Sequence, residues 1–191
     1  MANMAARLLA VLIGIHANLV AAQVLTMAHY NAVELQRESA TSVQFAFSLN
    51  LPQTLHPLLA PQLTLPGFLQ RYADLPDAAL EKELAKASAA LSDKAYFTLP
   101  SGAKTTMTQW QWPDKQSVRD VFRTSLVLLK MPPDANAHLD PMRVLARARA
   151  KSPISRAQLQ LPAVLYPIEV SLPRDKFWLT EQIPMAIVEL P

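Results

Sequence analysis

The chain has 191 residues and no cysteine. A disulfide framework, a thiolate metal site and a cysteine nucleophile are therefore excluded. Glycine is also scarce, since three glycines stand against sixteen prolines. Proline stiffens extended segments and turns, whereas glycine loosens them, so the sequence predicts stiff elements with proline-bounded ends.

Sequence motifs of the common enzyme classes are absent as well. The chain contains no GxGxxG, GxxxxGKS/T, HExxH or GxSxG, the patterns that hold nucleotides, zinc or an activated serine. Carboxylates are few and lie mostly on predicted helix faces, as Glu81, Glu83 and Asp93 do. A non-enzymatic function is therefore favoured, although a catalytic site assembled from distant residues stays open.

Charged residues make up 17% of the chain, below the usual quarter, and the net charge is +3. This charge is too small to indicate nucleic-acid binding by itself. The length suits one domain preceded by a removable leader, and such a domain can bury a core without metal or disulfide support.

The only long apolar stretch covers residues 8–19, directly after Arg7, and small residues follow it. This order is typical of a secretory signal peptide. Two alternatives stay open, an uncleaved membrane anchor and a plain buried helix. An anchor needs about 20 apolar residues, and the stretch reaches that length only if His16 and Asn18 are included.

Two cleavage sites fit the rule of small residues before the cut, after Ala22 and after Ala28. The predicted organisation is a signal peptide over residues 1–28 and a single exported domain over residues 29–191. An exported location, periplasmic or secreted, follows from this interpretation.

From residue 31 onward the pattern is that of strands. Residues 43–51, VQFAFSLNL, alternate between apolar and polar side chains, which predicts a half-buried strand. Residues 31–39 alternate more weakly and are expected to pair with it as a hairpin. Turn signals also recur at short spacing beyond residue 141, which indicates a second group of antiparallel strands.

Helical spacing appears only between these groups. Residues 78–91 and residues 118–130 carry apolar side chains three and four positions apart, behind short proline-bounded pieces. The predicted fold class is α+β. It consists of an antiparallel β-rich sandwich or curled sheet, with two helices inserted between the N- and C-terminal strands.

Two tryptophans lie close together in a predicted strand that follows a turn at residues 100–102. Strict alternation places Trp110 and Trp112 on one face and Met107 on the opposite face. Exposed, the two rings would form a stacking or carbohydrate-binding platform. Buried, they would anchor the core, which is the more frequent role of such residues.

A row of cations marks the strand MRVLARARAK. Four of them share one face and a fifth follows: Arg143, Arg147, Arg149, Lys151 and Arg156. No acidic residue falls between positions 141 and 156, so the row could bind a polyanion such as lipid phosphate, lipopolysaccharide or an acidic partner surface. The alternative is an edge strand protected from aggregation by its charges.

Histidines offer a possible copper site. Cleavage after Ala28 would give His29 a free α-amine beside its imidazole, and together with His56 or His138 these nitrogens could chelate Cu(II). The alternative is a single exposed histidine near the terminus. Cleavage after Ala22 would remove the copper hypothesis, because His29 would then be internal.

Together these patterns favour a non-enzymatic exported, periplasmic binding or assembly module. Its expected partner is an envelope protein or an anionic surface and not nucleic acid, and no membrane span remains after cleavage. The alternative is a periplasmic copper-binding protein that uses His29, and no other cofactor is expected.

Overall fold

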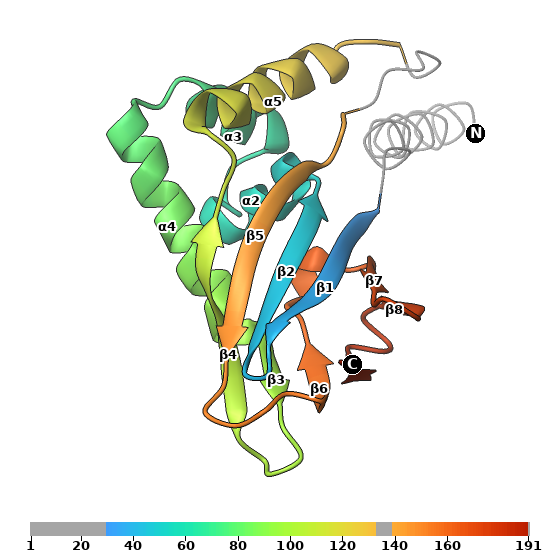
Figure 1. The fold of residues 1–191 in the computed structure, drawn as a ribbon. Helices are drawn as coiled ribbons and strands as arrows, with labels where there is room; N and C mark the ends of the chain where they lie inside the picture. Colours follow the sequence, from blue (N-terminus) through green and yellow to red (C-terminus); the bar gives the residue numbers. More distant parts are fainter. Residues whose placement is uncertain (1–29, 133–138, 191) are drawn as a thin grey trace, which may run out of the picture.

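The computed structural model describes residues 30–132 and 139–190, so the signal-peptide prediction falls on residues outside the described part. Over the described residues, nine strands form one mixed sheet in the order β8-β7-β1-β2-β5-β4-β3-β6-β9. Four described α-helices lie between β2 and β5 in the chain. Figure 1 shows that the sheet curls strongly, while the helices gather at one end and along one side of it.

The N-terminal hairpin is formed by β1 (Asn31–Ser39) and β2 (Ser42–Leu49), as predicted. Its inward positions carry the large apolar side chains, and Phe45 and Phe47 are fully buried. The outward positions carry polar or small side chains, because one face of the hairpin faces the core and the other faces solvent.

The helices follow directly on the hairpin. They are α2 (Leu51–Leu59), α3 (Leu65–Ala73), α4 (Asp77–Lys94) and, after two intervening strands, α5 (Lys115–Leu128). Side chains of Asn50, Thr64 and Asp114 accept hydrogen bonds from first-turn backbone N–H groups and so cap α2, α3 and α5. Prolines in the first turns of α2 and α3 cost no hydrogen bond there, which explains the proline-bounded sequence.

The remaining strands complete the sheet: β3 (Tyr96–Thr98), β4 (Lys104–Gln111), β5 (Met142–Arg149), β6 (Arg156–Gln160), β7 (Ile168–Ser171), β8 (Lys176–Leu179) and β9 (Met185–Glu189). A single 3-10 turn, η1 (Ala163–Leu165), precedes β7. The sheet is nearly barrel-shaped, since Arg37 Nη1 of β1 donates a hydrogen bond of 3.2 Å to the backbone oxygen of Leu190, just beyond β9. These two strands are not neighbours in the sheet, so the bond reaches across the curl.

The core fills the concave side of the curled sheet. Phe45 packs against Phe47 and Phe97, with ring centroids 6.1 and 5.3 Å apart. On the helical side, Phe68 of α3 meets Phe122 of α5 at 5.5 Å. One continuous apolar cluster therefore joins sheet and helices, which is the arrangement of a single α+β unit.

The α+β class and the β-rich sheet are confirmed, but finer parts of the prediction are not. The sheet is mixed and not purely antiparallel, because β1 and β7 run parallel. The sandwich alternative is not confirmed, since the described strands form one sheet. The predicted pair of inserted helices is also not confirmed, because α2 and α3 are complete helices of nine residues each.

Candidate functional site

A β-bulge in β4 determines where its tryptophans lie. Thr108 pairs with Arg147 of β5, and the next pair along, Gln111 with Leu145, is reached only after one extra residue on β4. Gln109 occupies the bulge with a φ of 53°, the left-handed region that non-glycine residues rarely adopt.

The extra residue reverses the alternation of side chains beyond it. Trp110 and Trp112 consequently lie on the same side of β4 as the buried Met107, facing α4 and the core. The predicted separation of Met107 from the tryptophans was therefore wrong, because strict alternation holds only while the strand is regular.

The two indoles continue a row of rings that begins in the core. Phe47 and Trp110 lie 5.4 Å apart with an angle of 23° between their planes. Trp110 and Trp112 lie 6.4 Å apart at 21°. Both indoles are half-buried, so neither the fully buried nor the fully exposed alternative describes them.

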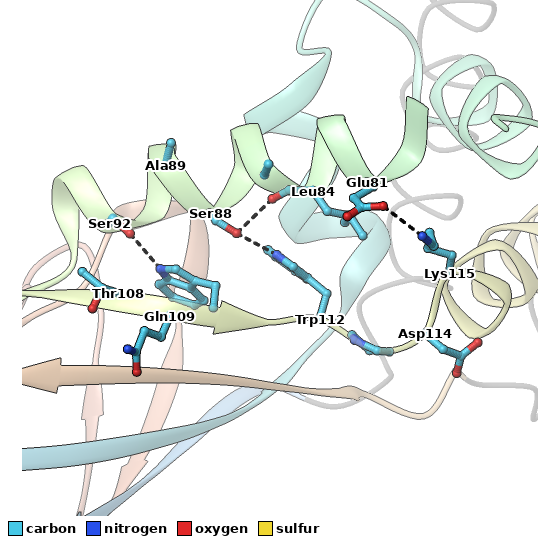
Figure 2. Close-up of a pocket in the computed structure, with 13 residues that line it drawn as sticks. Glu81, Leu84, Ser88, Ala89, Ser92, Thr108, Gln109, Trp112, Asp114 and Lys115 are labelled. Atoms are coloured by element: carbon cyan, nitrogen blue, oxygen red, sulfur yellow. Dashed lines mark hydrogen bonds and ion pairs between the residues drawn. The ribbon is translucent and has the colours of Figure 1, made fainter. Parts of the chain in front are cut away.

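Serines of α4 hold the indole nitrogens. Trp110 Nε1 donates to Ser92 Oγ and Trp112 Nε1 donates to Ser88 Oγ, each at 2.8 Å. Ser88 in turn donates to the backbone oxygen of Leu84 at 3.0 Å (Figure 2). Because neither indole N–H is left without a partner, the rings are oriented and their polar edges are satisfied.

A groove of about 580 Å³ lies between α4 and β4. We call it the tryptophan groove and define it by its lining. The lining consists of Glu81, Leu84, Ala85, Ser88, Ala89 and Ser92 of α4, Thr108, Gln109 and Trp110 of β4, Trp112, Pro113 and Asp114 of the connection to α5, and Lys115 at the start of α5. The residues from α4 recur at helical spacing and most are small. Small side chains opposite large rings leave the space open, and the volume is in the range of small-ligand sites.

Charged groups lie at one end of the tryptophan groove. Lys115 Nζ and Glu81 Oε2 form an ion pair of 3.0 Å, which Figure 2 shows at the groove's rim. Asp114 accepts hydrogen bonds from the hydroxyl and the backbone N–H of Ser117, at 2.5 and 2.9 Å, and these bonds hold the pKa of Asp114 below its ordinary value. Both carboxylates therefore already have a partner, Lys115 for Glu81 and Ser117 for Asp114.

The predicted basic row is only partly brought together. Arg143, Arg147 and Arg149 share the outer face of β5, and Arg143 and Arg149 are exposed. Arg147 is neutralised by Glu38 of β1 at 2.9 Å. The alternative of a charged edge strand was wrong, because β5 lies inside the sheet between β2 and β4.

The other two cations of the row lie after β5. Lys151 is exposed in the connection to β6. Arg156 starts β6 and approaches Glu189 of β9 at 3.9 Å, with both side chains largely exposed. An exposed pair at this distance contributes little stability, and it leaves Arg156 apart from the β5 cations in the sheet order.

The copper hypothesis stays a prediction. His29 and His138 lie outside the described residues. His56 is half-buried in α2, where its Nε2 lies 2.8 Å from the backbone oxygen of Leu63 and its ring packs 5.2 Å from that of Phe68. Within residues 30–132 and 139–190, no group of three or more histidines, cysteines or carboxylates is placed to hold a metal ion.

No described helix combines the length and hydropathy that a membrane span requires. Comparison with known proteins gives no match: no family model, no curated protein and no solved structure matches this chain. The interpretation of the tryptophan groove therefore depends on its own geometry and chemistry.

Sequence reasoning found the two tryptophans and the helix over residues 78–91, but it did not place them against each other. The available signal was the run of small residues at positions 85, 88, 89 and 92, which share one face of a helix. A face of small residues beside a tryptophan pair predicts either close packing or a groove. Only the position of α4 against β4 decides between the two.

Proposed function

We propose that this chain is a non-enzymatic binding module whose ligand site is the tryptophan groove. The observation that carries the proposal is that both indole N–H groups donate hydrogen bonds to serines, Trp110 to Ser92 and Trp112 to Ser88. With their polar edges satisfied internally, Trp110 and Trp112 have only their apolar ring surfaces to offer to a ligand.

The chemistry of the lining supports binding and not catalysis. The ionisable residues of the groove are Glu81, Asp114 and Lys115. Each is engaged in an ion pair or a helix cap, and the lining includes no histidine, cysteine or tyrosine. A general base or nucleophile needs a group that is free to react, and each member of this set is already engaged.

Backbone strain at the bulge also supports a functional role for the groove. A left-handed non-glycine residue costs about 1–2 kcal/mol, and Gln109 lines the groove at this strained position. Strain of this kind concentrates at functional sites, where the surrounding structure maintains it. Here it turns two tryptophans toward a helix made of small residues.

The experiment uses the indole N–H signals of the three tryptophans in a ¹⁵N-labelled full chain. A panel of small neutral, anionic, cationic and apolar compounds is titrated while these signals are recorded. We expect a saturable shift at Trp110 and Trp112 without a shift at Trp178, which contacts Tyr30 and does not line the groove.

Two alanine variants provide the matched control. Ala89→Leu fills the tryptophan groove, whereas Ala78→Leu adds the same side chain at an exposed α4 position outside it. Binding should be lost only with Ala89→Leu. A panel that shifts neither groove indole, or binding that survives Ala89→Leu, contradicts the proposal.

An exported location is part of the proposal and is supported by the sequence of residues 1–28. The intact mass of the protein purified from its native source should correspond to a chain that starts at Gln23 or His29. A mass that includes Met1, from protein found in the cytosol, would contradict export.

A second binding function is favoured by a separate observation. Arg143, Arg149 and Lys151 form no ion pair with any other described residue, although Arg147 beside them does. Two of these cations lie on one sheet face and the third follows it in the chain, and such exposed cations support contact with an anionic surface of the cell envelope. Sedimentation with phosphatidylglycerol vesicles should fall in Arg143→Glu/Arg149→Glu and in high salt, but not in Lys82→Glu on α4.

A further inference from the structure

We infer that the ligand of the tryptophan groove is a neutral oligosaccharide, an inference that rests on the proposed binding function. Four properties of the groove lead to it. They are the presentation of the rings, the character of the polar groups at the two ends, the distribution of charge, and the length of the groove.

The rings present faces and not hydrogen-bond donors. Trp110 and Trp112 are close to parallel, at 21°, and both indole N–H groups are occupied by serines. A peptide in an aromatic groove presents backbone carbonyl groups that require donors, and the indoles have none left to give. A sugar ring places its C–H face on an aromatic ring and needs no indole donor.

The polar groups at the ends suit hydroxyl groups. Thr108 and Gln109 border the groove along β4, and both can donate and accept hydrogen bonds. At the other end, Glu81 and Asp114 offer acceptor oxygens and Lys115 offers donors. An acyl chain would desolvate these groups without replacing their hydrogen bonds, whereas sugar hydroxyls can both donate and accept.

The charge distribution excludes strongly charged ligands. The end with Lys115 holds two carboxylates against this one ammonium group, so an anionic headgroup would meet net repulsion there. A cation would find no free carboxylate, because Glu81 is paired with Lys115 and Asp114 caps α5. A neutral polyhydroxyl ligand meets neither obstacle.

The length of the groove favours more than one sugar ring. Its α4 lining runs from Glu81 to Ser92, which corresponds to about 16 Å along a helix axis. Two rings spaced along β4 provide two successive stacking positions. A linear oligosaccharide fits this shape better than a monosaccharide does.

The test titrates the ¹⁵N-labelled full chain with neutral trisaccharides of glucose, mannose and N-acetylglucosamine. Lauric acid and a proline-rich peptide serve as the competing ligand classes. We expect at least one trisaccharide to shift the indole signals of Trp110 and Trp112 saturably, with the signal of Trp178 unchanged.

Variants separate stacking from folding. Trp112→Ala should weaken trisaccharide binding by up to about tenfold, since it removes one of the two ring faces on which a sugar can stack. Trp112→Phe should keep most of the affinity, because it preserves a ring face. Trp178→Ala should bind like the unaltered chain, and a Trp112→Ala protein that keeps the Trp178 signal at its original position is shown to be folded.

The outcomes distinguish this inference from the proposed function. Groove shifts caused by lauric acid or the peptide, with no trisaccharide response, overturn the oligosaccharide inference and leave the binding function intact. Trisaccharide binding that persists in Ala89→Leu also overturns the inference. If neither the trisaccharides nor any compound of the broader panel shifts the groove indoles, the proposed function fails and the inference fails with it.

Discussion

Gln109 provides the sharpest test of how the bulge builds the tryptophan groove. Its φ of 53° is the only positive φ among the described non-glycine residues. Replacement by glycine should relieve the strain, and replacement by valine should increase it, since a β-branched residue tolerates this region poorly. Gln111 lies two positions away on the same strand, outside the bulge, and supplies a control with the same side chain.

The magnitudes follow from the backbone. A left-handed conformation costs a non-glycine residue about 1–2 kcal/mol, and glycine adds about 0.5–1 kcal/mol of lost chain entropy. Gln109→Gly should therefore raise the free energy of unfolding by about 0.5–1 kcal/mol. Gln109→Val should lower it by about 1–2 kcal/mol. At Gln111 the signs should reverse, because regular strand favours valine over glycine.

Urea unfolding followed by tryptophan fluorescence measures these four variants. An altered midpoint with an unaltered slope would report stability alone. If glycine destabilised both positions equally, Gln109 would not be strained in solution, and the account of the bulge would fail.

Three further predictions concern the groove wall, the core and the helix junction. Ser92→Ala should lower the free energy of unfolding by about 0.5–1.5 kcal/mol, because it removes the acceptor of the hydrogen bond from the half-buried Trp110 indole, and the loss should vanish in a Trp110→Phe background when both are measured in urea. Phe47→Ala should cost about 3–5 kcal/mol, as for a fully buried aromatic ring, and should move the Trp110 indole signal. The pKa of Asp77 is lowered from its ordinary value of 3.8 by a hydrogen bond from Arg119, so the stability it contributes is present above that value and is lost as the pH falls through the lower folded-state pKa. Unfolding midpoints at about pH 5 and about pH 3 should therefore differ less in Asp77→Asn than in the unaltered chain.

Regular segments of the fold were predictable from local patterns. The alternation of residues 43–51 identified β2 and its buried face, and the helical spacing of residues 78–91 and 118–130 identified α4 and α5. In each case the chain satisfies its backbone hydrogen bonds in a regular way, and the side-chain period reports the structure directly.

The candidate site could not be predicted from local patterns, because it depends on the β-bulge at Gln109, where the strand is irregular. One extra position in β4 reverses the side of the strand on which Trp110 and Trp112 lie, and no sequence period signals a glutamine in the left-handed region. The surroundings of the β5 cations were not predictable for a different reason. Their shared face was predicted, but strand order and the pairing of Arg147 with Glu38 join residues far apart in the sequence.

The sequence by itself determined the α+β composition, the absence of thiol chemistry and the faces of the regular elements, because these depend on residue type and on neighbours within a few positions. Tertiary structure alone decided the sheet order, the near closure of the curl and the tryptophan groove. The groove exists because small residues of α4 lie against large residues of β4. Such a distance between two elements follows from the packing of the whole core and not from either segment.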